Sequence, residues 1–273
     1  SCCDEINGRI SVKIASGFYN NGKTHNLPSM IATIQLFDGT NGAPLCIMDG
    51  GLITGIRTGA AGAISAEYLA RRDASTVCVI GGGGQARMQV YGLSKVRSIK
   101  KIQVFSPYPA ELPQYKADIE QTVSIPVTIC DTVEAALLDA DIVVTTTPSK
   151  KYLVPANLIR EGTHIIAVGA DMAGKTEGDP RIFRGAKIVN DSIAQCISRG
   201  ETRNAIQSGV ITESDIYAEI GELAAGIKPG RTNSEEITIF DTTGMAIQDN
   251  VTAVKVYEMA KARNLGTWFE FFH

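Results

Sequence analysis

The sequence predicts an α/β protein in which a doubly wound parallel sheet takes up most of the chain and a smaller α+β domain takes up the rest. From residue 76 onward, short runs rich in Val and Ile alternate with helix-forming stretches. A glycine-rich turn directly follows the first of these runs, and residues 1–50 instead carry successive β-prone segments with short polar breaks. Apolar strands separated by helices are typical of a parallel sheet covered on both faces.

Composition narrows the class of protein. The 273 residues are 44% hydrophobic, which is enough for one large domain or two moderate ones. The net charge of -3 gives no electrostatic reason to expect nucleic acid or an anionic membrane as partner. No apolar run approaches the ~20 residues that span a bilayer, and no signal-peptide pattern opens the chain, so we expect a cytoplasmic protein. The cysteines and histidines show no metal-ligand spacing, so no metal is expected.

The N-terminal part predicts antiparallel β-structure followed by one unusual helix. Residues 9–17, 29–38 and 44–49 are rich in β-formers and are separated by polar, glycine-containing breaks. Residues 52–71 then form a helix rich in small side chains. Its three glycines, Gly55, Gly59 and Gly62, each cost about 1 kcal/mol of helix stability relative to alanine. Such a helix is explained by the close approach of another backbone.

The remaining elements follow in order along the chain. Strands are expected at 76–80, 101–105, 127–129, 141–147, 164–169, 187–190 and 236–240. Residues 242–266 are expected to form a long amphipathic helix, which Thr242 or Thr243 can cap and Gly266 closes.

The segment "VCVIGGGGQARMQ" (77–89) is the most informative turn. Gly81, Gly83 and Ala86 fit the pattern G-x-G-x-x-A between a strand and a helix. In a dinucleotide-binding turn the first glycine makes the bend, the second admits the pyrophosphate, and the third small residue lets helix and strand pack closely. Gly84 and Gln85 open the helix, whose unpaired N–H groups would face the phosphates. The alternative is a turn that is merely flexible.

Other strand ends should flank the same cofactor, NAD or NADP. The second strand ends at Ser106 in "SPYP" (106–109), where neither a carboxylate nor an arginine stands. Because an acid at this place would reject a 2′-phosphate, its absence favours tolerance of NADP. Ser106 could equally be an ordinary turn residue. Ligands lie over the carboxyl ends of parallel strands, so Thr145, Thr146, Thr147 and Val168 are expected beside the cofactor.

Three charged residues stand in apolar or small-residue surroundings. Arg57 lies in "TGIRTGAAG", where its guanidinium is either at the surface or aimed at a carboxylate. Lys13 interrupts a strand, and a lysine in a strand is most often solvent-facing. Asp171 follows the strand at 164–169, as a general acid/base or as a turn-forming residue. Residues 175–177 are expected to be solvated loop residues.

Several segments together resemble one family. These are "LITGIRTGAAGAISAEYLARRDASTVCVIGGGGQA", "ADIVVTTTPS", "VGADMAGKTE", "NDSIAQCISRGE" and "IFDTTGMAIQDNVTA". In this order they are similar to the ornithine cyclodeaminase/mu-crystallin family, which also contains archaeal-type alanine dehydrogenases and reductases of cyclic imino acids. The resemblance implies an NAD(P)-binding Rossmann domain at 63–241. It also implies a substrate-binding and homodimerisation domain at 1–62 plus 242–273.

The resemblance also implies roles for individual residues. Arg57 and Lys13 match positions that hold the substrate carboxylate, Asp171 matches the acid credited with proton transfer, and Asp249 matches a motif with a structural role. Family members carry a further N-terminal segment with an arginine and a glutamate of the substrate site, and we expect this chain to begin after it. The implied partner is a small amino or imino acid.

Hydride transfer at the α-carbon of an amino or imino acid is therefore the expected reaction. Ornithine cyclodeaminase, which converts L-ornithine to L-proline and ammonia, is the leading activity. The alternatives are an alanine dehydrogenase, a Δ1-pyrroline- or piperideine-2-carboxylate (ketimine) reductase, and a mu-crystallin-like NAD(P)-binding protein without significant turnover.

Overall fold

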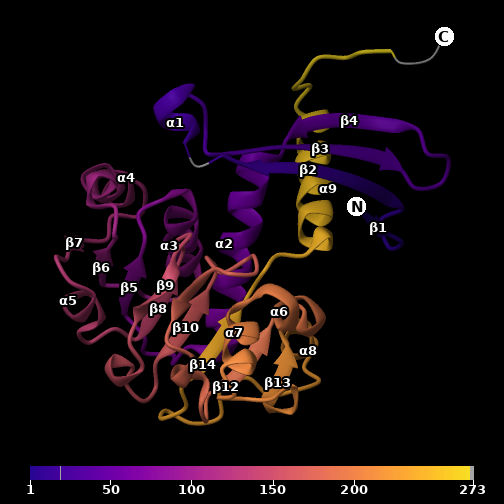
Figure 1. The fold of residues 1–273 in the computed structure, drawn as a ribbon. Helices are drawn as coiled ribbons and strands as arrows, with labels where there is room; N and C mark the ends of the chain where they lie inside the picture. Colours follow the sequence, from indigo (N-terminus) through magenta and orange to yellow (C-terminus); the bar gives the residue numbers. More distant parts are fainter. Residues whose placement is uncertain (19, 271–273) are drawn as a thin grey trace. The chain divides into compact units, whose positions relative to one another are not determined.

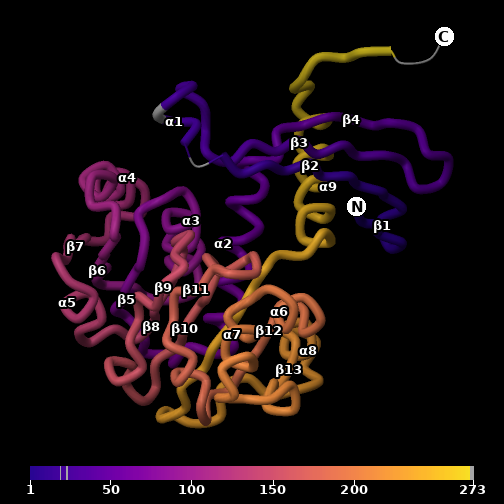
Figure 2. The backbone as a smooth tube through the Cα atoms, viewed as in Figure 1, coloured from indigo at the N-terminus to yellow at the C-terminus, as the bar shows by residue number. Residues whose placement is uncertain are grey.

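The structure is a computed structural model that describes residues 1–18 and 20–270. It divides into two compact units, one formed by Ser1–Arg57 with Met245–His273 and the other by Thr58–Gly244 (Figures 1 and 2). The unit boundaries fall after residues 57 and 244, whereas the sequence placed domain boundaries after residues 62 and 241. The roles expected for the two domains stay predictions.

The larger unit is built on an eight-stranded sheet whose strands all run parallel (Figure 1). Its spatial order is β13-β12-β14-β10-β8-β5-β6-β7. The strands are β5 (Thr76–Ile80), β6 (Lys101–Phe105), β7 (Val127–Ile129), β8 (Ile142–Thr145), β10 (His164–Ala167), β12 (Lys187–Asn190), β13 (Ile216–Glu219) and β14 (Thr238–Asp241). This confirms the predicted doubly wound α/β fold.

The sheet's chain order locates its ligand-binding edge. The chain leaves β5 towards β6 and β7 on one side and then returns to β8 and β10 on the other. The order therefore reverses between β5 and β8. In open parallel sheets, ligands bind outside the carboxyl ends of the strands at such a reversal. The turns that follow β5 and β8 are accordingly the first places to look for a site.

Helices and a short second sheet complete this unit (Figure 1). The α-helices that lie wholly within it are α3 (Gly84–Val96), α4 (Leu112–Val123), α5 (Val133–Leu137), α6 (Ile193–Arg199), α7 (Glu201–Gln207) and α8 (Ile220–Ala224). The 3-10 helices are η1 (Pro109–Glu111), η2 (Ala156–Leu158), η3 (Pro180–Phe183) and η4 (Glu213–Asp215). Strands β9 (Lys150–Val154) and β11 (Thr176–Gly178) form a two-stranded sheet.

The glycine-rich helix is α2 (Gly50–Leu69), and its second half belongs to the larger unit. A Cβ added at Gly59 would lie 2.4 Å from the carbonyl oxygen of Met88 on α3. A Cβ at Gly92 of α3 would lie 2.5 Å from the carbonyl oxygen of Gly59. The two backbones are therefore in contact, which is the close approach that the glycines of this helix predict.

The smaller unit is a four-stranded antiparallel sheet packed against helix α9 (Ala246–Ala262). Its strands are β1 (Cys2–Asp4), β2 (Arg9–Gly17), β3 (Met30–Asp38) and β4 (Pro44–Asp49), and α1 (Asn21–Thr24) connects β2 to β3. Ile34 of β3, Ile53 of α2 and Ala253 of α9 are buried together and form the core of this unit.

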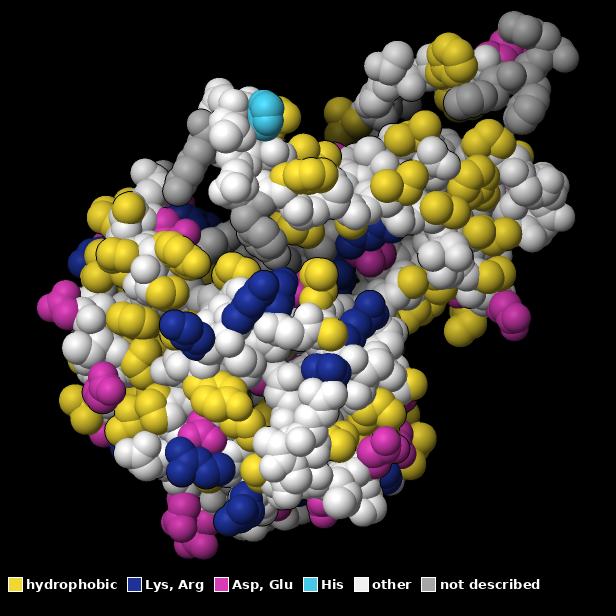
Figure 3. Space-filling model, in the orientation of Figure 1, with side chains coloured by type: hydrophobic (Ala, Val, Ile, Leu, Met, Phe, Trp, Pro, Cys, Tyr) yellow, Lys and Arg dark blue, Asp and Glu magenta, His cyan; other side chains and the backbone are white. Residues whose placement is uncertain are grey.

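The other face of this antiparallel sheet exposes several apolar side chains. Side chains alternate between the two faces of a strand, so the burial of Ile34 puts Ile31 on the opposite face. Ile31, Ile14 and Ile47 are all exposed, with Ile14 at 64% and Ile47 at 59%. Figure 3 shows hydrophobic side chains gathered over β2, β3 and β4.

Helix α9 is shorter at both ends than the sequence predicted. It begins at Ala246 because the preceding residues are held elsewhere. The Thr242 hydroxyl donates to the Asp191 carboxylate at 2.7 Å, and the N–H groups of Thr243 and Gly244 donate to the same oxygen. Thr242 and Thr243, which were predicted to cap this helix, therefore lie before it and bind Asp191 instead. Among the helices of the described residues, none combines the length and apolar character that crossing a membrane requires.

Candidate functional site

The turn after β5 is shaped by a glycine that no other residue could replace without strain. Gly81 has a φ of +110°, and a Cβ on it would lie 2.8 Å from the Thr146 hydroxyl oxygen and 3.1 Å from the Thr147 methyl carbon. Its N–H donates to the carbonyl oxygen of Phe105 at the end of β6. The bend therefore places the turn against the carboxyl ends of β6 and β8.

The next part of the turn is open. A Cβ built on Gly83 or Gly84 would meet no atom within 4 Å. Gly83 is the N-cap of the 13-residue helix α3 and carries no capping side chain, so the N–H groups of the first helical turn keep the free donors that every helix start has. Ala86 is buried against the sheet. Bare backbone, free donors and a positive helix end are the features that fit a dinucleotide pyrophosphate.

Gln85 was predicted to contact the cofactor from the first turn of α3. Its side-chain oxygen is buried and has no hydrogen-bond partner within the described residues. An unsatisfied buried acceptor is costly, so such an atom calls for a partner from outside the chain.

The turn after β8 is held by a carboxylate that the sequence analysis placed wrongly. Glu177, expected to be a solvated loop residue, is fully buried. It accepts the N–H of Thr147 and, at 3.0 Å, the N–H of Gly169. Val168 in turn donates its N–H to the carbonyl oxygen of Thr145 at 3.0 Å. Glu177 therefore fixes the turns after β8 and β10 to one another, and burial raises its pKa to about 8.

Asp171 lies in the turn after β10, at the predicted edge of the sheet. Its carboxylate pairs with the Nζ of Lys175 at 2.6 Å. The Asp171 side chain is 46% exposed, whereas that of Lys175 is 11% exposed, so Lys175 is not the solvated residue that the sequence analysis expected. A solvent-accessible carboxylate that is held by an ammonium group can take up and pass on a proton.

In the smaller unit, the two predicted anion-binding residues converge. Lys13 Nζ lies 3.0 Å and Arg57 Nε lies 3.1 Å from the same carboxylate oxygen of Asp249. Arg57 Nη1 also donates to the side-chain oxygen of Gln248 at 3.0 Å. These side chains are 17% exposed for Lys13, 11% for Arg57 and 9% for Asp249. Lys13 therefore faces inward from β2, contrary to the usual orientation of a strand lysine.

The charge balance of this cluster suits one more carboxylate. Two cations face one anion, so the cluster of Lys13, Arg57 and Asp249 is net positive. Burial lowers the pKa of Lys13, and Arg57 adds to the effect, while Asp249 opposes it. A second carboxylate would compensate the excess positive charge, and a guanidinium can bind it through two parallel hydrogen bonds.

One carboxylate at this edge of the sheet was not among the residues that the sequence predicted. The Glu111 carboxylate, at the end of η1, accepts the Gly82 N–H at 2.9 Å and the Ser106 hydroxyl at 2.9 Å. It therefore lies at the carboxyl end of β6, where the sequence analysis found no acid. Pro109, which starts η1, was the available signal, because proline favours the first position of a helical turn.

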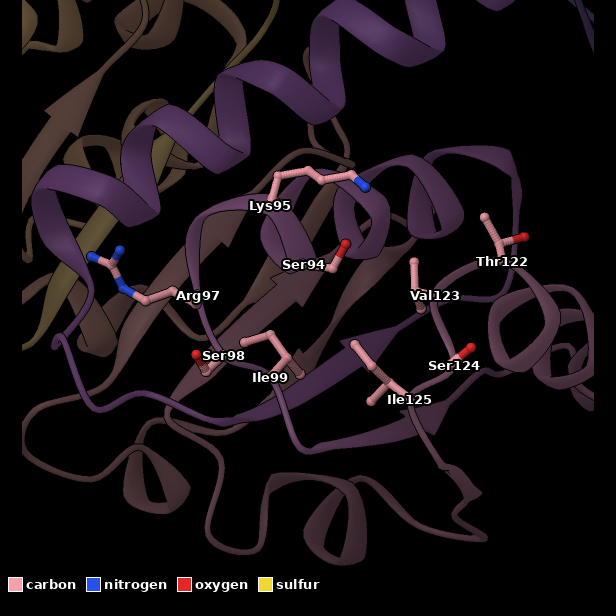
Figure 4. Close-up of a pocket in the computed structure, with 9 residues that line it drawn as sticks. All are labelled: Ser94, Lys95, Arg97, Ser98, Ile99, Thr122, Val123, Ser124 and Ile125. Carbon is pink, nitrogen blue, oxygen red and sulfur yellow. The ribbon is translucent and has the colours of Figure 1, made fainter.

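A pocket lies elsewhere in the larger unit. It has a volume of about 440 Å³ and is lined by the ends of α3 and α4 and the segments that precede β6 and β7 (Figure 4). These segments lead into the amino ends of parallel strands, whereas Gly81 follows a carboxyl end, so the pocket is at the opposite edge of the sheet. The basic groups of this pocket already have partners within the chain. Lys95 Nζ lies over the Tyr91 ring, and the Arg97 guanidinium donates hydrogen bonds to carbonyl oxygens and to Glu67.

Among the described residues, no group of three His, Cys, Asp or Glu side chains could hold a metal ion.

The chain is similar to known proteins over nearly its whole length. The model of the ornithine cyclodeaminase/mu-crystallin family matches residues 3–264. The alanine dehydrogenase of Archaeoglobus fulgidus is 42% identical over 246 residues, which are 90% of this chain and 76% of that protein. The structure of Thermococcus litoralis Δ1-pyrroline-2-carboxylate reductase with NADH and L-proline aligns with a TM-score of 0.92 at 36% identity, over 95% of this chain and 80% of that one. An archaeal alanine dehydrogenase dimer with bound NAD aligns with a TM-score of 0.91 at 40% identity, over 97% and 82% of the two chains.

Proposed function

The chain belongs to the ornithine cyclodeaminase/mu-crystallin family and is an NAD-dependent oxidoreductase of it, and on this premise we propose that it interconverts an L-α-amino acid and the corresponding imino acid with net oxidation or reduction. The relatives compared above are an alanine dehydrogenase and an imino-acid reductase. They favour the alternative activities over ornithine cyclodeaminase, which was the leading expectation from the sequence.

The observation that carries the proposal is the cluster of Lys13, Arg57 and Asp249. Every substrate of this reaction class has a carboxylate next to the carbon that gains or loses hydride. Lys13 and Arg57 would hold that carboxylate, and Asp249 keeps both cations in place. Fixing the carboxylate fixes the α-carbon, and orientation of this kind can supply much of the rate.

The cofactor supplies hydride acceptance or donation at its nicotinamide ring, and the chain supplies binding and alignment. Gly83, Gly84 and Gln85 would hold the pyrophosphate of NAD. Thr146 and Thr147 would lie beside the same cofactor. Glu177 accepts hydrogen bonds from the Thr147 and Gly169 N–H groups, and these bonds keep the two turns in one conformation.

Asp171 is proposed as the proton-transfer residue. Oxidation of the amine to the imine releases a proton from nitrogen, and the reverse reaction returns one to it. The Asp171 carboxylate would accept and donate this proton, and Lys175 holds the carboxylate in position at 2.6 Å.

The exposed apolar face of the antiparallel sheet supports a homodimer. Ile14, Ile31 and Ile47 are exposed on one face, and a contiguous apolar face is a common protein–protein interface. A second copy of the chain, packed on this face, would bury these side chains.

Three assays on the purified protein separate the activities. Consumption of NADH is measured with Δ1-pyrroline-2-carboxylate and with pyruvate plus ammonium, and proline formation from ornithine and NAD is measured alongside net NADH. We expect NADH consumption in at least one of the first two. Proline from ornithine without net NADH, and no turnover elsewhere, would restore the cyclodeaminase assignment.

A pair of variants tests the site itself. Asp171→Asn should lower turnover by about 100-fold or more, the usual contribution of a general acid/base, while NADH binding persists. Asp131→Asn removes an exposed carboxylate elsewhere and should leave turnover unchanged. Full turnover by Asp171→Asn would exclude the proton-transfer role.

A further inference from the structure

The Glu111 carboxylate lies directly on the backbone of the glycine-rich turn. Both of its hydrogen bonds, from the Gly82 N–H and the Ser106 hydroxyl, go to the oxygen Oε1. A Cβ added at Gly82 would lie 3.0 Å from Glu111 Cγ and 3.1 Å from Oε1. The turn therefore has glycine at position 82 because a side chain comes over it from η1.

Ser106 connects this carboxylate to the strand end. The Ser106 hydroxyl donates to Glu111 and accepts the Tyr108 N–H at 3.0 Å. It is buried, so the loop after β6 is held in one conformation that carries Glu111 back over the turn. A residue six positions beyond the end of β6 therefore places its carboxylate where an acid at the strand end would lie.

The charge of Glu111 is not neutralised locally. Among the described side chains, no Lys or Arg forms an ion pair with it. Arg87 of α3, which contacts the same turn, donates its Nε–H to Asp118 at 2.8 Å and its Nη1–H to the Gly82 and Gly83 carbonyl oxygens. Oε2 of Glu111 has no hydrogen-bond partner within the described residues and is free to accept one.

We propose that Glu111 recognises the 2′-hydroxyl of the adenosine ribose and makes the protein select NAD(H) over NADP(H). In a doubly wound fold this ribose lies over the end of the second strand, beside the turn that holds the pyrophosphate. Oε2 would accept the 2′-hydroxyl. A 2′-phosphate in the same place would meet an unpaired carboxylate and would be repelled. The preference is opposite to the one expected from the residues 106–109 alone.

This inference rests on dinucleotide binding at Gly81–Gly84, which is part of the proposed function. The competing explanation is that Glu111 only braces the loop after β6 against the turn. Removing a brace would weaken the binding of NADH and NADPH alike. Removing a group that recognises the 2′ position would instead change the ratio of their two affinities. The ratio of the two dissociation constants is therefore the quantity to measure.

The experiment is a titration of the purified protein with NADH and with NADPH, followed by nucleotide fluorescence. It is run on the wild type, on Glu111→Gln, and on Glu134→Gln as a control. Glu134 is an exposed carboxylate at the start of α5, so its removal changes the net charge equally without touching the turn. We expect the wild type to bind NADH at least roughly 10-fold more tightly than NADPH, a typical effect of one hydrogen bond to a charged group. Glu111→Gln should reduce this ratio by roughly 10-fold, and Glu134→Gln should leave it unchanged.

A second measurement needs no variant. Displacement of bound NADH from the wild type by 5′-AMP should require a lower concentration than displacement by 2′,5′-ADP, because the two differ only at the 2′ position. Equal affinities of the wild type for the two cofactors or for the two fragments, or an unchanged ratio in Glu111→Gln, would overturn the role of Glu111 and leave the cofactor turn standing. Failure of both cofactors to bind would overturn the turn and the inference together.

Discussion

Replacing Gly59 by alanine tests the contact between α2 and α3. The new Cβ would lie 2.4 Å from the Met88 carbonyl oxygen, about 1 Å closer than an ordinary contact. The obstacle is helix backbone, which cannot rotate away as a side chain can. A clash with backbone lies in the upper part of the range for overpacking, about 2–3 kcal/mol, and the better helix propensity of alanine returns about 1 kcal/mol. We expect a net loss of roughly 1–2 kcal/mol.

The assay is thermal unfolding followed by circular dichroism. A loss of this size should lower the midpoint by roughly 2–8 °C in a unit of this length. Gly221→Ala is the matched control, because Gly221 is also a helix glycine but its added Cβ would meet no atom within 4 Å. That variant should be as stable as the wild type or slightly more so. If Gly59→Ala melts at or above the midpoint of Gly221→Ala, the two helix backbones are not in contact.

Two further predictions follow from burial and exposure. His164 is fully buried between Ser65 and Thr238, and burial, with Arg231 nearby, lowers its pKa to about 3. The unfolded chain takes up this proton below about pH 6.5 and the folded chain does not, so the free energy of unfolding should fall by up to ~1.4 kcal/mol per pH unit between pH 6 and 4. Urea unfolding at several pH values measures this fall. His164→Asn should be less stable than the wild type at pH 7.5, but its free energy of unfolding should lack the pH dependence that His164 contributes. An equally steep fall in the variant would contradict the assignment to His164. Ile47→Asp should halve the particle mass in light scattering, whereas a dimer that persists would exclude the sheet face as the interface.

The fold could be predicted because its signals are local. Strands such as 76–80 and 187–190 are short runs of Val and Ile, and the structure places them at the same residues. The glycines of α2 indicated a neighbouring backbone because they have no other explanation in a helix. The edge strand β13 was missed, because "IYAE" (216–219) is neither continuously apolar nor alternating.

The side chains of the candidate site were harder to predict because their roles depend on partners far along the chain. Lys13 faces inward and pairs with Asp249, which lies 236 residues away in the sequence, and no pattern around Lys13 indicates this. Glu177 has hydrophilic neighbours in "AGKTEGDP", yet it is buried because two turns direct their N–H groups at it. Glu111 required the geometry of a 3-10 turn, which residue spacing does not supply.

Helix α9 imposes an order of events on synthesis of the protein. Strands β1 to β3 leave the ribosome before the larger unit, but the helix that covers them and contributes Ala253 to their core follows the whole larger unit. The parallel sheet can therefore fold before helix α9 is available to cover strands β1 to β3. Asp249 is part of that helix, so Lys13 and Arg57 acquire their shared counter-ion only after the larger unit has been synthesised.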